Sequence, residues 1–154
     1  GLFAENHMPN SQNRKPSLRE MTKTALDVLS RERNGFFLMV EGSQIDWAAH
    51  DNISDQIMIE TSDFDDTIGE VVRFAEKDAQ TLVIVTADHE TGGYALNGGS
   101  LAERKVVGAF TTKGHTAAMV PLFAMGPGAE RFTGIQDNTM VGKILMELLS
   151  GRSR

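Results

Sequence analysis

Two apolar runs along the chain each end at residues with carboxylate or imidazole side chains. One run covers residues 36–40 and is followed by Glu41, and the other covers residues 81–87 and is followed by Asp88 and His89. Both runs are rich in β-favouring residues and too short for a globular helix, so each predicts a buried strand. In an open α/β sheet, ligands bind beyond the carboxyl ends of the strands. We therefore expect these three side chains to lie at such an edge.

The rest of the pattern predicts helices around these strands. Apolar residues recur at helical spacing in residues 17–31, 54–77 and 139–149, and a third apolar run at 120–125 predicts another strand. The first helix begins with a capping box, because Ser17 is followed three residues later by Glu20. The alternation of helices and strands predicts the α/β class, with a doubly wound, mostly parallel sheet and flanking helices.

The chain is expected to form a single α/β domain over residues 1–154. Residues 94–113 contain glycine pairs and a short β-like run, which predicts a small excursion at the edge of the sheet. The acidic cluster at residues 63–66 lacks the glycine and the final glutamate of an EF-hand loop, so we interpret it as a solvated face. Residues 151–154 are expected to form a frayed tail.

Composition narrows the possible partners. The formal net charge is -6 and Lys and Arg are not clustered, which disfavours nucleic acid and anionic membranes as partners. No apolar stretch reaches the length of about 18 residues that indicates a membrane span. Cysteine is absent, so His, Asp and Glu are the strong metal ligands that the chain offers.

Asp46 and His50 are spaced i, i+4, so on a helix they lie one turn apart on the same face and can chelate one cation. The same pair is also common where an aspartate caps a helix and an ordinary histidine follows within it. The spacing alone therefore leaves both a metal-binding pair and a helix cap open. His115 follows a glycine in a predicted loop, and taken alone it would be interpreted as an ordinary loop histidine rather than a metal ligand. His7 lies in a polar loop and is expected to be solvated.

Asp88 and His89 are adjacent, and successive strand residues point to opposite sides. Both can reach one cation if the chain bends after them, as Gly92 and Gly93 allow. Imidazole with carboxylate suits zinc, and carboxylate with water suits magnesium. Two cations about 4 Å apart can hold the attacking and leaving oxygens of a phosphoryl group, although these ligands alone would not select phosphate over a peptide.

Three motifs together resemble the C-terminal metal motifs of alkaline phosphatases. They are Val40 to Asp46 with His50, Val85 to Gly93, and Gly114 to Thr116, and the resemblance runs from about residue 1 to residue 149 with order and spacing intact. It implies two zinc ions and one magnesium ion. Position by position, it assigns Asp46, His50 and His115 to the first zinc, Asp88 and His89 to the second zinc, and Glu41 to magnesium.

The same resemblance implies what the chain does not contain. The family's serine nucleophile lies in an Asp-Ser-Ala tripeptide, which does not occur in this sequence, so no catalytic residue is assigned. The chain resembles the C-terminal half of an alkaline phosphatase, and the resemblance implies the N-terminal half as a partner. It also implies a phosphomonoester substrate, a periplasmic or secreted location and a homo-oligomer, a dimer in the family. Trp47 stands where relatives often have Lys or His, which weakens the expectation for phosphate binding.

Two other functions fit the same residues. The chain could be a non-catalytic metal-binding or assembly fragment, which a zinc titration would distinguish from an apolar scaffold. It could also belong to another member of the superfamily, such as a phosphomutase or a sulfatase-like enzyme, which shares the metal ligands and differs in the nucleophile. The sequence through Thr91-Gly92-Gly93 and Gly114-His115-Thr116 favours the phosphatase.

Overall fold

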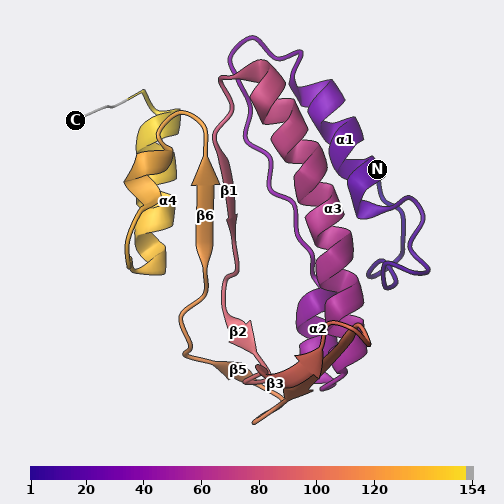
Figure 1. Cartoon of the computed structure of the whole chain (residues 1–154). Helices are drawn as coiled ribbons and strands as arrows, with labels where there is room; N and C mark the ends of the chain where they lie inside the picture. The colour runs from indigo at the N-terminus through magenta and orange to yellow at the C-terminus, as the bar shows by residue number, and fades with distance from the viewer. Residues whose placement is uncertain (152–154) are drawn as a thin grey trace. The chain divides into compact units, whose positions relative to one another are not determined.

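The computed structural model describes residues 1–151 (Figure 1), and residues 152–154 of the expected tail lie outside the described part. Its contacts divide the chain into two compact units. The first unit contains residues 1–71 and 89–118, and the second contains residues 72–88 and the chain from residue 119 onward. The expected single domain stays a prediction.

The helices agree closely with the sequence pattern. The first unit contains α1 (Leu18–Leu29), α2 (Gln44–His50) and most of α3 (Ser54–Asp78), which continues into the second unit. The predicted capping box is present at the start of α1: the Ser17 hydroxyl accepts from the Glu20 backbone N–H at 3.2 Å, and the Glu20 carboxylate accepts from the Ser17 N–H at 2.8 Å.

Residues 1–17 are attached to α3 by polar contacts. Buried Arg14 forms an ion pair with Asp63, and the Ser11 N–H donates at 2.9 Å to the carboxylate of Glu60, which is also buried. Figure 1 shows α1 beside α3, where Arg19 and Glu70 form an ion pair at 3.1 Å. The interpretation of the acidic cluster as a fully solvated face is therefore wrong at Asp63, which the N-terminal segment covers.

The strands of the first unit form two antiparallel pairs. A hairpin of β3 (Ala95–Ser100) and β4 (Lys105–Ala109) corresponds to the predicted excursion. The short strands β2 (Glu90–Thr91) and β5 (His115–Thr116) pair with each other and bring two distant parts of the sequence together.

The second unit pairs β1 (Val83–Thr86) with β6 (Leu122–Met125), with Val83 opposite Met125. The 3-10 helix η1 (Ala129–Phe132) contacts β6 and buries Phe132, and α4 (Asn138–Leu149) follows. Asp137 caps α4, because its carboxylate accepts from the Thr139 N–H at 3.0 Å.

The predicted parallel sheet is not what the described residues form. All three strand pairs are antiparallel, including β1 with β6. Parallel neighbours need a crossover connection, usually a helix. The segment between β1 and β6 contains short strands and no helix, and it brings the chain back in the opposite direction. Residues 36–40 form no strand, although Phe37 and Met39 are exposed and their neighbours are partly buried, as in the pattern of a strand.

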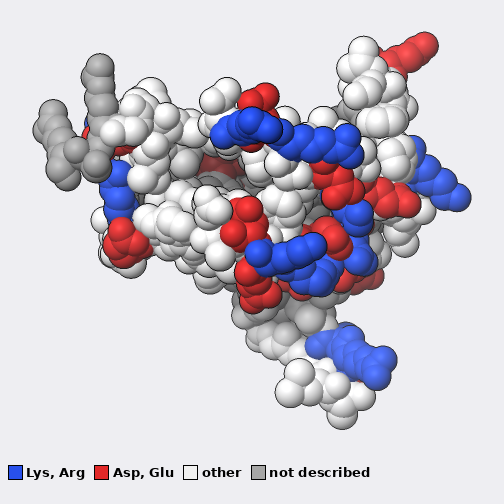
Figure 2. Space-filling model, turned by 90° about the horizontal axis from the view of Figure 1, so that it is seen from above, with Lys and Arg blue, Asp and Glu red and all other residues white. Residues whose placement is uncertain are grey.

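The surface carries both signs of charge. On the face shown in Figure 2, Lys and Arg side chains lie among Asp and Glu side chains rather than in one basic patch. Within residues 1–151, no helix is long and apolar enough to cross a bilayer.

Candidate metal centre

The candidate ligands of the first unit come from α2 and from β5. Asp46 lies in the first turn of α2 and His50 in its last turn, so the helix places both side chains on one face. Ser43 occupies the N-cap position of α2 without a side-chain capping hydrogen bond, so Asp46 lies inside the helix and not at its cap. His115 is the first residue of β5, whose partner β2 contacts α2. Figure 1 shows α2, β2 and β5 gathered at one end of this unit.

Three ligand atoms converge there. His50 Nε2 lies 3.1 Å from His115 Nε2, and Asp46 Oδ1 lies 3.5 Å from the former and 3.7 Å from the latter. Zinc bonds of about 2.0–2.1 Å at tetrahedral angles separate ligand atoms by about 3.4 Å. The observed triangle therefore has the dimensions that a zinc ion requires.

The contact at the far side of the His50 ring determines which nitrogen faces the cluster. His50 Nδ1 lies 2.5 Å from the backbone carbonyl of Lys113, which can only accept a hydrogen bond. Nδ1 therefore carries the proton in the neutral ring, and Nε2 presents its lone pair toward His115 and Asp46. Metal-binding histidines are oriented by the same kind of contact.

Thr91 is a site residue that the sequence did not single out. Its buried hydroxyl donates to Asp46 Oδ1 at 2.6 Å and lies 3.1 Å from His89 Nδ1. Since the one hydroxyl proton is directed at Asp46, the His89 Nδ1–H donates to the hydroxyl oxygen. Thr91 thus connects a predicted ligand of the first zinc with a predicted ligand of the second.

His89 and His115 lie against each other. Their rings stack with centroids 3.5 Å apart and an interplanar angle of 20°. The chain turns at Gly92 and Gly93, directly after β2, where these glycines have φ of +88° and +55°. A Cβ at Gly93 would lie 1.9 Å from Thr111 Oγ1, so the bend requires glycine for space as well as for conformation.

Glu90 organises the same turn. Its carboxylate accepts from the backbone N–H groups of Gly93 at 3.2 Å and Tyr94 at 3.1 Å, and from the hydroxyl of Thr116. The hydrogen bond from Thr116 is the largest of the effects that lower the pKa of Glu90, and the two backbone N–H groups act in the same direction. The carboxylate is therefore held in its ionised form beside the imidazoles.

Two further metal ligands predicted from the sequence are Glu41 and Asp88. Glu41 is exposed and precedes α2, and Asp88 is an exposed residue of the second unit. Their roles as ligands stay predictions. His7 is exposed, and its ring meets that of Trp47 edge-on with centroids 4.4 Å apart. The expectation of a purely solvated His7 therefore missed this contact.

The donor set of two imidazoles and one carboxylate is compatible with a zinc ion. Catalytic zinc sites use three protein ligands and leave a position for water or substrate, whereas structural sites use four. Asp46, His50 and His115 form the group of three whose ligand atoms can share a cation, and their side chains are 34%, 40% and 49% exposed. A cation bound there would remain accessible from solvent.

Comparison with known proteins assigns the family. Residues 1–109 match the sequence model of the alkaline phosphatase family. The chain belongs to the alkaline phosphatase family. Alkaline phosphatase 3 of Bacillus subtilis is 32% identical over 97% of this chain, and the repressible alkaline phosphatase of Saccharomyces cerevisiae is 43% identical over 60% of it. The matched regions cover 48% and 18% of these relatives.

Solved alkaline phosphatases have the same fold. The enzyme from the Antarctic bacterium TAB5 is 39% identical, with a TM-score of 0.88 over 97% of this chain and 45% of its own. A variant of that enzyme with Mg bound in its M3 site has a TM-score of 0.86 and the same identity, over 97% of this chain and 46% of its own. The cold-active alkaline phosphatase of Shewanella sp. is 29% identical with a TM-score of 0.87, over 97% of this chain and 55% of its own. The chain therefore has an alkaline phosphatase-like α/β fold and spans about half the length of these relatives.

Proposed function

We propose that this chain supplies most of the metal ligands of an enzyme that hydrolyses phosphate monoesters. The observation that carries the proposal is the triangle of Asp46 Oδ1, His50 Nε2 and His115 Nε2, with sides of 3.1, 3.5 and 3.7 Å. Membership of the alkaline phosphatase family supports the choice of phosphate over other substrates. It also favours the phosphatase over a phosphomutase or a sulfatase-like enzyme.

The proposed centre contains two zinc ions and one magnesium ion. Asp46, His50 and His115 would hold the first zinc, Asp88 and His89 the second, and Glu41 the magnesium. The Mg in the solved TAB5 variant supports a magnesium site in the family. When bound, such cations supply Lewis acidity to a phosphoryl oxygen and activate an oxygen nucleophile.

The chain itself contributes hydrogen bonds that orient the side chains of the metal ligands. The Lys113 carbonyl fixes the His50 ring, and Thr91 fixes the Asp46 carboxylate. The exposure of His115 leaves solvent and substrate access to the cluster. The serine nucleophile and the groups that clamp phosphate would come from sequence that this chain does not contain, since no Asp-Ser-Ala tripeptide occurs in it.

The remaining proposals follow from the family. We expect a periplasmic or secreted enzyme that forms a homo-oligomer and acts on phosphomonoesters. These properties belong to the complete enzyme, and this chain spans 48% of the length of alkaline phosphatase 3 of Bacillus subtilis.

Calorimetric titration of the chain with zinc tests the metal site. The parent chain should bind zinc, and His115→Ala or His50→Ala should weaken binding by more than about 100-fold, because each removes a ligand rather than a supporting contact. His7→Ala is the matched control, since His7 is in the same unit and contacts Trp47 instead of the cluster. Absence of binding in the parent would leave only a scaffold role.

A second measurement addresses the nucleophile. The purified chain with zinc and magnesium should not hydrolyse a generic phosphomonoester such as p-nitrophenyl phosphate above the background reaction. Robust hydrolysis that copurifies with the chain and disappears in His115→Ala would show that the chain contains its own nucleophile. Zinc binding that never supports activity, even with the missing half supplied, would favour the non-catalytic metal-binding fragment.

A further inference from the structure

Glu90 is the first residue of β2, the short strand that pairs with β5. It directly follows His89, and its cross-strand neighbour in the pairing of β2 with β5 is Thr116, which directly follows His115. Directly opposed residues in an antiparallel pair have their side chains on the same face. The carboxylate of Glu90 is thereby in a position to connect the two segments.

Both oxygens of the Glu90 carboxylate accept hydrogen bonds. One oxygen accepts from the Gly93 N–H and the Thr116 hydroxyl, and the other accepts from the Tyr94 N–H. Three donors therefore converge on two acceptor oxygens, and a carboxylate is the side-chain group that accepts on both. An amide would direct its NH₂ group at one of these donors.

The turn at Gly92 and Gly93, which Glu90 closes, is also hydrogen-bonded to the segment that leads to His115. The Gly92 N–H donates to the Gly114 carbonyl at 2.9 Å, and the Gly92 carbonyl accepts from the Thr111 N–H at 3.0 Å. A shift of this turn would move the backbone on both sides of the stacked histidine rings. The hydrogen bonds of Glu90 hold the turn to the second residue of β5 as well as to itself.

We propose that Glu90 is a positioning residue, which fixes His89 and His115 against each other so that the ligand cluster is formed before a cation binds. The proposal rests on the metal-binding function proposed above. Preformed ligand geometry requires that the segments carrying the ligands be held in place, and the three hydrogen bonds of Glu90 hold the turn after β2 and join it to β5.

The test compares Glu90→Ala and Glu90→Gln with the control Glu103→Ala, which removes a carboxylate in the β3–β4 turn of the same unit. Two properties of the full chain are measured. The first, without metal, is the proximity of the His89 and His115 rings, from NMR cross-relaxation between their ring protons and from ring-current shifts. The second is zinc affinity, from competition with a chromophoric chelator.

We expect Glu90→Ala to abolish the ring proximity and to weaken zinc binding about tenfold or more, at the lower end of the effect of losing a residue that supports a metal ligand. Glu90→Gln should have an intermediate effect, and Glu103→Ala should have none. If Glu90→Ala fails to fold by circular dichroism, Thr116→Val replaces it, because this variant removes one donor and leaves the glutamate. Glu90→Gln and Thr116→Val should then be non-additive in a double-mutant cycle.

The outcomes separate this inference from the metal-binding function. Retention of the ring proximity or of parental zinc affinity in Glu90→Ala would overturn the positioning role. A parent chain that shows the ring proximity and binds no zinc would overturn the metal-binding function. Loss of the proximity in Glu90→Ala would in that case still support Glu90 as the residue that positions the rings.

Discussion

At the scale of single residues, Thr91 has the most specific arrangement in the candidate site. A hydroxyl has one proton to donate and lone pairs to accept, and both are used, toward Asp46 and from His89. The side chain is buried, so water does not readily replace either contact. Few other side chains of this size could serve both neighbours.

Thr91→Val removes the hydroxyl and keeps the shape. It leaves Asp46 Oδ1 without this donor and the His89 Nδ1–H without this acceptor. We expect zinc affinity to fall by about 10–100-fold and the free energy of unfolding to fall by about 1–3 kcal/mol. Competition with a chelator and urea denaturation measure the two effects.

Two further variants serve as controls for Thr91→Val. Thr91→Ser keeps the hydroxyl and should retain most of the zinc affinity. Thr133→Val removes an exposed hydroxyl that donates to the Glu130 carbonyl in the second unit, and should change neither quantity appreciably. Equal zinc affinities for Thr91→Val and the parent would contradict the role assigned to the hydroxyl.

The sequence was informative about those residues whose chemistry is uncommon. Asp46, His50 and His115 were assigned together because their motifs resemble those of alkaline phosphatases, and the structure brings their ligand atoms together. Thr91 and the carbonyl of Lys113 were not predicted. Threonines and backbone carbonyls occur everywhere in a chain, so their importance here depends on distances that the sequence does not contain.

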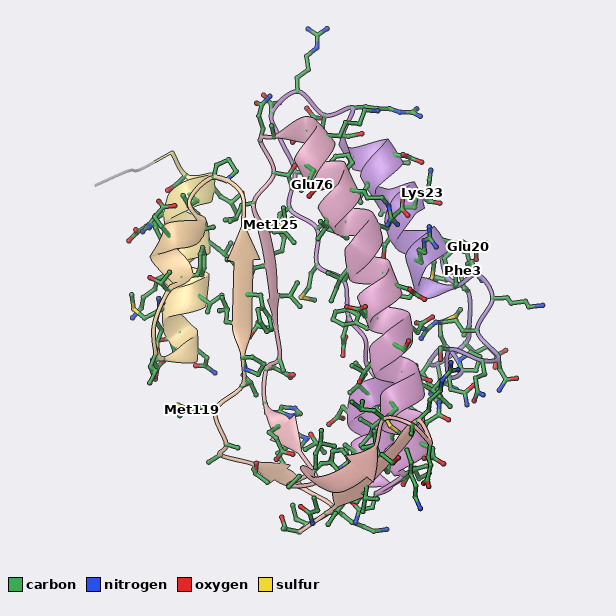
Figure 3. All side chains as sticks on the ribbon, in the orientation of Figure 1. Phe3, Glu20, Lys23, Glu76, Met119 and Met125 are labelled. Atoms are coloured by element: carbon green, nitrogen blue, oxygen red, sulfur yellow. The ribbon has the colours of Figure 1, made fainter. Side chains whose placement is uncertain are left out.

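At the scale of elements, the start of α1 gives a prediction about pH. Figure 3 labels Glu20 on this helix, where hydrogen bonds from the backbone N–H and the hydroxyl of Ser17 lower the pKa of its carboxyl group. A lowered folded-state pKa means that the stabilisation is fully present above the ordinary Glu pKa of about 4.3. It is lost as the pH falls through the lower folded-state value.

We therefore expect Glu20→Gln to reduce the dependence of unfolding free energy on pH below about 4.3. Urea denaturation from neutral pH to acid measures the effect. Ser17→Ala removes the N-cap hydroxyl and should cost about 0.5–2 kcal/mol at neutral pH. Identical pH profiles for the parent and Glu20→Gln would show that the capping box does not form in solution.

The turn after β2 gives a second prediction at this scale. Gly93→Ala places a methyl group where Thr111 Oγ1 lies and forces a residue with a Cβ to adopt a φ of +55°. The backbone strain alone should cost about 1–2 kcal/mol, and the clash adds to it. Urea denaturation should show this loss for Gly93→Ala and little change for the control Gly98→Ala, since a Cβ at Gly98 meets nothing within 4 Å.

Helices were predicted better than the sheet for a physical reason. The caps of α1 and α4 involve residues two or three positions apart, so the sequence contains both partners. Strand pairing joins distant segments, and the direction of β1 relative to β6 depends on how residues 87–121 return. Residues 36–40 show the same limit, because their apolar pattern is that of a strand but no strand of the described residues pairs with them.

At the scale of the whole molecule, the chain spans about half the length of the relatives that it matches. The solved relatives have the same fold over 97% of the chain, so this half is similar to the corresponding part of each complete enzyme. If an N-terminal half completes the enzyme, as proposed above, it would cover apolar side chains that are exposed here. Phe37 and Met39 fit this inference, with 58% and 77% of their surfaces exposed.

This inference predicts that the chain alone self-associates through residues 36–40, because exposed apolar strand-like segments are sites of aggregation. Replacing both Phe37 and Met39 by Ser should lower the association constant measured by sedimentation velocity and reduce binding of a hydrophobic dye. Ile135→Ser is the control, since Ile135 is 86% exposed but lies outside this segment. If the double replacement leaves self-association unchanged and Ile135→Ser abolishes it, the surface through which the chains associate lies on the second unit instead. The proposed N-terminal half should also suppress self-association by covering residues 36–40. Adding it to the parent chain should therefore have the same effect as the double replacement.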